Sequence, residues 1–184
     1  MRRPALRIVQ ALCATAITSL AAFARPAPPP AAQPVWLSIF GERELPDGSW
    51  SGADLLAADG SQIDRFQVTI RPESATYVRI EAVTSEGVQQ LFPSRPEEAL
   101  LAADRSWSLP GPRAFFEIRG EAKLRVVLRQ AAVAGSGETP VFATPGAHPV
   151  TYPLSDGAAF RLGERAFVPA ATGSSALTVP LHGR

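Results

Sequence analysis

The acidic residues in the first third of the chain are the side chains with the clearest potential for chemistry. They are Glu42, Glu44, Asp47, Asp54 and Asp59. Two carboxylates that flank a sugar can hydrolyse a glycosidic bond, and several converging carboxylates can bind calcium. This group surrounds a Pro-Asp-Gly turn and lacks the alternating Asp/Asn spacing of a calcium loop. We expect a solvated turn, with weak calcium binding as the alternative.

Nucleophilic or zinc chemistry would need a positioned imidazole with suitable partners. His148 and His182 have no His, Cys or acidic residue at ligand spacing in the sequence, so both are expected in exposed loops. Ser136, between two glycines, lacks the strand-to-helix context of a nucleophile elbow. The single cysteine, Cys13, lies in the N-terminal apolar run. We therefore predict that the protein is not an enzyme and holds no metal or cofactor.

Charged residues at alternating positions suggest a binding surface instead. In the segment TYVRIEAV, Tyr77, Arg79 and Glu81 point away from the apolar side. Arg125 and Arg129 have the same placement in KLRVVLR, which is expected on a neighbouring strand. These five side chains could form cross-strand ion pairs, a partner-binding face or simply a solvated face.

Tryptophans offer a second kind of site. Trp36, Trp50 and Trp107 could present flat rings to the apolar faces of sugars, and Trp50 and Trp107 are the candidate contacts. Aromatic residues in β-sandwiches more often fill the core or cover its edges. Carbohydrate binding is therefore kept as an alternative to protein binding.

The elements that must position these residues are mostly strands. Residues 63–71 and 76–94 alternate apolar and polar side chains, and the second segment does so on both sides of a Ser-Glu-Gly turn. Gly87 tolerates the positive φ that this turn requires, and Pro93 cannot donate to a strand ladder. We expect a β-hairpin that ends at Pro93.

The rest of the chain is expected to complete an all-β, single β-sandwich-like domain of antiparallel strands over residues 35–184. Further strands are predicted at residues 35–40, 114–118, 123–129, 158–170 and 176–182. Residues 41–56 have the composition of loops and turns, and residues 97–104 could form a short helical turn. Residues 131–149 have no useful periodicity and predict a long exposed loop.

The N-terminal segment has the order of a secretory signal peptide. Residues 1–24 combine three arginines, a short apolar run and an Ala-x-Ala exit, and residues 25–34 form a proline-rich spacer. Cleavage after Ala24 would leave 15 basic and 17 acidic residues, a net charge of about −2. We expect a periplasmic or secreted protein with no nucleic-acid partner and no stable membrane insertion.

The segment from Asp64 to Gln130 resembles the bacterial family known as domain of unknown function 4384. The resemblance rests on the order FQVTI, TYVRIEAV, a Glu-Gly turn, QLFPS, SLPGP, and the strand pair AFFEI and LRVVLR. It implies a small β-sandwich module that is accessory to, or binds, other proteins. We therefore expect a non-catalytic module that binds another cell-envelope protein, with a carbohydrate- or peptidoglycan-binding module as the alternative.

Overall fold

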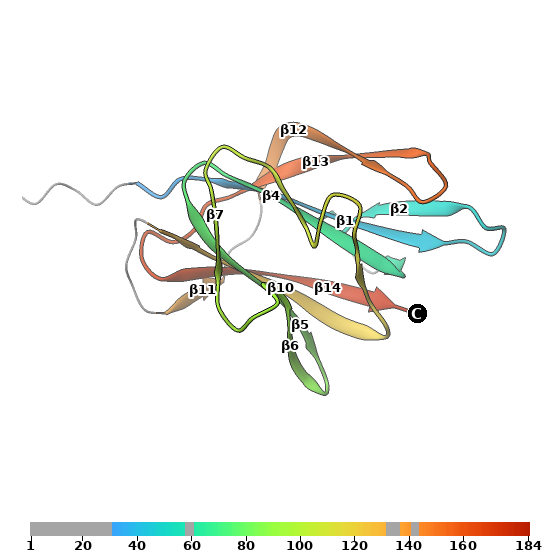
Figure 1. Ribbon diagram of the computed structural model, residues 1–184, viewed down its shortest axis with the longest axis horizontal. Coiled ribbons are helices and arrows are strands. Elements are labelled where there is room, and N and C mark those ends of the chain that lie inside the picture. The colour runs from blue at the N-terminus through green and yellow to red at the C-terminus, as the bar shows by residue number, and fades with distance from the viewer. Residues whose placement is uncertain (1–30, 58–60, 132–136, 141–143) are drawn as a thin grey trace, which may run out of the picture.

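The computed structural model describes residues 31–57, 61–131, 137–140 and 144–184, and these residues form two packed sheets with no helix (Figure 1). The predicted signal peptide and residues 25–30 of the spacer lie outside the described residues. Sheet A contains β1 (Val35–Glu44), β2 (Trp50–Asp54), β4 (Arg65–Pro72), β8 (Trp107–Leu109), β9 (Phe116–Glu117), β12 (Thr144–Pro153) and β13 (Ala159–Phe167). Sheet B contains β3 (Gln62–Ile63), β5 (Thr76–Thr84), β6 (Gly87–Phe92), β7 (Ala99–Leu101), β10 (Glu121–Gln130), β11 (Glu138–Pro140) and β14 (Ser174–Gly183).

The prediction of an all-β, sandwich-like fold is confirmed. Sheet A runs in the order β12-β13-β1-β4-β8 and sheet B in the order β11-β14-β10-β5-β6. The pairings along both orders are antiparallel except that of β11 with β14; β3 also pairs parallel with β14. Both sheets are therefore antiparallel, as expected, apart from these two short parallel pairings at β14 in sheet B.

The main core lies between the two sheets and follows the alternation in the sequence. Its fully buried members from β1 and β4 are Val35, Leu37, Ile39, Val68 and Ile70. Sheet B contributes Val78, Ile80, Leu124, Val126 and Leu128, all equally buried. Because strand side chains alternate with a period of two, the residues between these core positions point to the outer faces of the sheets.

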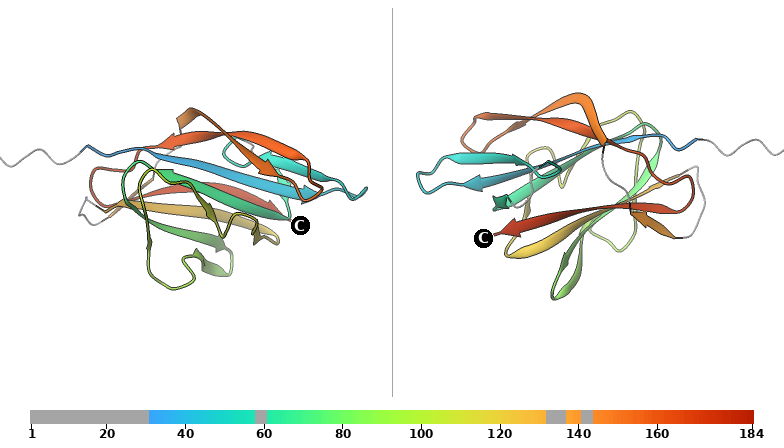
Figure 2. Two further views of the ribbon diagram at one scale, coloured as in Figure 1. Left: turned by 45° about the horizontal axis from the view of Figure 1, so that its top comes forward. Right: turned by 180° about the vertical axis from the view of Figure 1, so that it is seen from behind.

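The predicted hairpin is present as β5 and β6. Gly87 has a backbone φ of 139°, a value that residues with a Cβ atom rarely adopt. The pairing contains a bulge, because Ile80 is opposite Phe92 whereas Glu81 is opposite Gln90. The hairpin ends at Phe92, as the position of Pro93 predicted, and it extends beyond the rest of the sandwich (Figures 1 and 2).

Three local predictions were wrong. Residues 41–56 are mostly strand, because β1 continues to Glu44 and β2 returns beside it after a short turn. The expected helical turn at 97–104 contains strand β7, which pairs with β5 and buries Leu101. The described parts of the expected loop at 131–149 include β11 and the first part of β12. Both are edge strands, where proline is tolerated because a backbone N–H that faces outward needs no partner strand.

A second, smaller core covers the outer face of sheet A. Strand β13 pairs with β1 only from Val35 to Leu37, and β2 takes its place along β1 from Phe40 to Glu44. The β12–β13 hairpin thereby lies on the opposite side of β1 from β10 and β14 (Figure 1). Phe40, Tyr152 and Leu162 are buried together between the hairpin and the sheet. Strand β1 is consequently buried on both faces.

Candidate functional site

The predicted surface residues come together on the outer face of sheet B. In the register of β5 and β10, Tyr77 is opposite Arg129 and Glu81 is opposite Arg125. Arg79 lies between the other two residues on β5. The sequence-based expectation that these five residues occupy neighbouring strands is confirmed. We call this set the β5–β10 face.

Glu81 is the electrostatic centre of the β5–β10 face. Arg125 donates a hydrogen bond from Nε to Oε2 of Glu81 at 2.8 Å. The Nε atom of Arg79 lies 2.8 Å from Oε1, although its N–H makes no hydrogen bond there. Glu81 is only 7% exposed, so of the three possibilities for this face the cross-strand ion pair is formed and a freely solvated face is not. One carboxylate therefore holds two guanidinium groups in place.

Arg129 is fixed by two further contacts. Its guanidinium lies 4.3 Å from the centre of the Tyr77 ring, which is a cation–π distance. It also donates to Oε2 of Glu98 from Nη2 at 3.0 Å. Arg125 has a second carboxylate, Glu138, at 3.8 Å. The arginines of this face are thus paired with acidic groups and form an ordered surface with little net charge.

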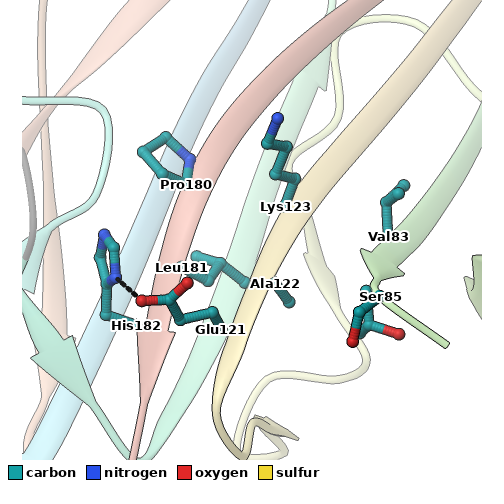
Figure 3. Close-up of a pocket in the computed structure, with 9 residues that line it drawn as sticks. Val83, Ser85, Glu121, Ala122, Lys123, Pro180, Leu181 and His182 are labelled. Carbon is teal, nitrogen blue, oxygen red and sulfur yellow. Dashed lines mark ion pairs between the residues drawn. The ribbon is translucent and has the colours of Figure 1, made fainter.

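An open hollow of about 400 Å³ continues this face toward one end of sheet B (Figure 3). Val83, Lys123 and Pro180 follow one another across β5, β10 and β14 in register. Below them, Nδ1 of His182 lies 4.0 Å from Oε1 of Glu121. His182 is therefore a strand residue beside a carboxylate, and the prediction of an exposed loop position was wrong. His148 lies in β12, but its side chain is not among those that the structure describes.

Strand β6 forms an edge beside the same face. Within the described ranges it pairs only with β5, so its other edge is free for hydrogen bonding. Its sequence, GVQQLF, contains no charged residue and no proline. Natural edge strands usually carry such residues to prevent pairing with other chains. Val88 is 61% exposed on this strand.

The two candidate tryptophans do not share a surface. Trp107 is opposite Ile70 in the register of β8 and β4, and it packs against the main core. Trp50 is opposite Glu44, on the other face of sheet A, where its ring lies 4.4 Å from the guanidinium of Arg65. Both side chains are partly buried. A carbohydrate platform that uses both rings is therefore not formed.

A buried ion pair lies beside Trp50 and was missed in the sequence. Arg65 donates from Nε to Oε1 of Glu42, which is fully buried, and from Nη2 to the hydroxyl of Ser155. Ser155 also donates to Oε1 of Glu42 at 2.9 Å. Oε2 of Glu42 is buried and has no hydrogen-bond partner among the described residues. The acidic side chain that was expected in a solvated turn is thus fully buried.

The other acidic residues of that segment have separate roles. Asp47 accepts hydrogen bonds from the backbone and hydroxyl groups of Ser49, and these bonds lower the pKa of the Asp47 carboxyl. Asp54 pairs with Arg165 at 3.3 Å. Glu44 is exposed at the end of β1, and its backbone N–H donates to Oδ2 of Asp64 at 2.8 Å. Asp59 lies outside the described residues, and the others show no group of three or more metal-binding side chains.

Tyr152 connects the β12–β13 hairpin to sheet A through a buried hydroxyl network. Its hydroxyl lies 2.6 Å from the hydroxyl of Ser38 and 2.6 Å from that of Thr69. All three residues are buried. Burial raises the pKa of Tyr152 above its usual value of about 10, because a phenolate would lose its hydration. Tyr152 therefore remains a neutral structural group at neutral pH.

Stability should depend on this phenol at high pH. Below about pH 10 Tyr152 is protonated in both states, and above it the unfolded chain ionises first, so the free energy of unfolding falls as pH rises. Tyr152→Phe should cost about 1–3 kcal/mol at pH 8, and this deficit should shrink at pH 11. Urea unfolding of both proteins at the two pH values measures the effect. An unchanged deficit would contradict it.

Neither the secondary structure nor the comparisons with known proteins point to a particular function. Over the ranges that are described, no helix has the length and apolarity needed to cross a membrane. Ser136 lies outside those ranges. Comparison of the chain with protein-family models, curated proteins and solved structures found no match. The function of these surfaces is therefore inferred from their geometry and chemistry.

Proposed function

We propose that this protein is a non-catalytic accessory module of the bacterial cell envelope, periplasmic or secreted, that binds another envelope protein through sheet B. The observation that carries this proposal is the contrast between the two outer faces. The outer face of sheet A is covered by the β12–β13 hairpin, whereas Thr178, Pro180 and Val88 are exposed around the β5–β10 face. The signal-peptide pattern and the resemblance of residues 64–130 support the same proposal.

The β5–β10 face has the properties of a protein-binding surface. Its arginines are held by Glu81 and Glu98 before any partner arrives, so little side-chain entropy is lost when they make contact. Tyrosine and arginine are also the residues that most often dominate binding energy at protein interfaces. The free edge of β6 can add backbone hydrogen bonds to an extended segment of the partner.

Site-specific photocrosslinking in native envelopes tests this function. A photoreactive residue at Thr178 should capture a reproducible protein partner, and the same residue at Val168, which is exposed elsewhere, should not. The charge-neutral double variant Arg79→Gln/Glu81→Gln should reduce capture at least about tenfold, the loss expected for interface hot spots. Its circular dichroism spectrum should be unchanged. If no partner is recovered, or if Val168 captures it equally, the proposal fails.

The carbohydrate alternative has less support. Trp107 packs on the main core and Trp50 stacks with Arg65, so the two rings cannot bind one sugar chain together.

A further inference from the structure

A pocket of about 360 Å³ lies beside the second core, on the side of the molecule that the β12–β13 hairpin covers. Its size is at the lower end of the range for ligand sites, roughly 300–1,000 Å³. We call it the hairpin pocket. Strand β4, the loop before β9 and the turn after β12 all contribute to it, and its main lining residues are Arg65, Gln67, Arg113, Phe115, Tyr152 and Leu154.

The charge of the hairpin pocket favours an anion. Arg113 is exposed at the pocket, and none of the acidic side chains in the described ranges lies within ion-pair distance of it. Arg65 is neutralised by Glu42, but only its Nε and Nη2 make hydrogen bonds with the described residues. A carboxylate in the pocket would meet one uncompensated guanidinium and a free N–H group of another. Arginine is well suited to bind a carboxylate through paired hydrogen bonds.

Gln67 supplies a hydrogen-bond acceptor in the same pocket. Its Nε2 donates to the backbone carbonyls of Gly111, at 2.6 Å, and Ala114, at 3.0 Å. Because both neighbours are acceptors, the amide nitrogen must face them. Oε1 of Gln67 accepts no hydrogen bond from the described residues and is not a buried orphan. It is therefore available to a donor on a ligand.

The remaining lining is largely apolar. Phe115 and Leu154 pack against the second core, and Pro112 and Pro153 lie beside them in the lining. The ring of Phe115 is fixed by the guanidinium of Arg65, 4.7 Å from its centre. This rigid wall suits an apolar side chain of modest size.

We infer that the hairpin pocket binds the C-terminal residue of a peptide that ends in an apolar side chain. The terminal carboxylate would contact Arg113 and Arg65, the last backbone N–H would donate to Gln67, and the side chain would contact Phe115 and Leu154. A fatty acid has the charge and the apolar body but lacks the N–H donor. The site lies away from the β5–β10 face, so this inference is independent of the proposed function.

Synthetic peptides test the inference on the full chain by isothermal titration calorimetry. Acetyl-Ala-Ala-Leu with a free carboxylate should bind, and the same peptide with a C-terminal amide should bind at least about tenfold more weakly, as expected for loss of a charge-assisted contact. Arg113→Gln should weaken the free acid by a similar factor. Arg161→Gln is the matched control, because Arg161 is also exposed and does not line the pocket.

Several outcomes would overturn the inference. They are equal binding of the acid and the amide, equal loss in the Arg161→Gln control, and no binding at millimolar concentrations of peptide. Octanoate is the third probe: binding as tight as that of the peptide would indicate a general site for apolar carboxylates and would also overturn it. Arg113 and Arg161 are both exposed, so their glutamine variants should fold normally. These results are separable from photocrosslinking, which probes sheet B.

Discussion

Replacing Phe40 by alanine should lower the free energy of unfolding by about 3–5 kcal/mol, the usual cost of removing a buried phenylalanine. Phe40 is fully buried although it points away from the main core. Its ring stacks on that of Tyr152 at 4.6 Å and lies 5.5 Å from that of Phe160. The cavity left by alanine would remove the packing of the β12–β13 hairpin on β1.

Urea unfolding followed by circular dichroism measures this effect. Val168→Ala is the control, because Val168 is 53% exposed and its truncation should change stability by less than about 0.5 kcal/mol. A loss below about 1 kcal/mol in Phe40→Ala would mean that the hairpin does not pack against β1 as described. Binding of the test peptide to the hairpin pocket should weaken in the same variant, since the pocket wall belongs to the second core.

Gly146→Ala should also destabilise the protein, by about 1–3 kcal/mol or more, because the site has no room for a methyl group. A Cβ at this position would lie 2.2 Å from Cζ3 of Trp36 and 2.7 Å from the backbone oxygen of Glu164. The Trp36 ring cannot easily move, because its Nε1 donates to Glu73 at 2.8 Å. The backbone of β13 would have to shift instead.

Gly163→Ala provides a matched control within the same hairpin. The nearest atom to a Cβ at Gly163 is 3.9 Å away, which is an ordinary contact, and we expect stability within about 0.5 kcal/mol of the natural protein. Thermal or urea unfolding of the two variants side by side gives the comparison. Equal stabilities would show that the hairpin does not lie against Trp36.

The β5–β6 hairpin and the β5–β10 face were predictable because their strands alternate regularly between apolar and polar residues. In TYVRIEAV, every second residue is apolar, so alternation assigns Val78 and Ile80 to the core and Tyr77 and Arg79 to the other face. Only the burial of Glu81 was not predicted, because it depends on the ion pair with Arg125, a residue distant in sequence.

The second core was not predictable for a physical reason. Strand β1 is buried on both faces, so its polar residues Ser38 and Glu42 have the burial of core residues and break the expected pattern. Their partners, Tyr152 and Arg65, lie far along the chain, and the prolines of β12 resemble those of a loop. The hairpin pocket depends on the same long-range packing and could not be found from sequence alone.

The position of β14 has a consequence for the time at which the protein can fold. This last strand lies inside sheet B, with β10 on one side and β11 and β3 on the other. Sheet B therefore cannot be completed until residues 174–183 have left the ribosome, and the edge of β10 that pairs with β14 has no partner strand among the described residues until then. Such long-range pairing makes folding slow. An unfinished chain thus presents an unpaired strand edge at β10, which is open to pairing with other chains until β14 covers it.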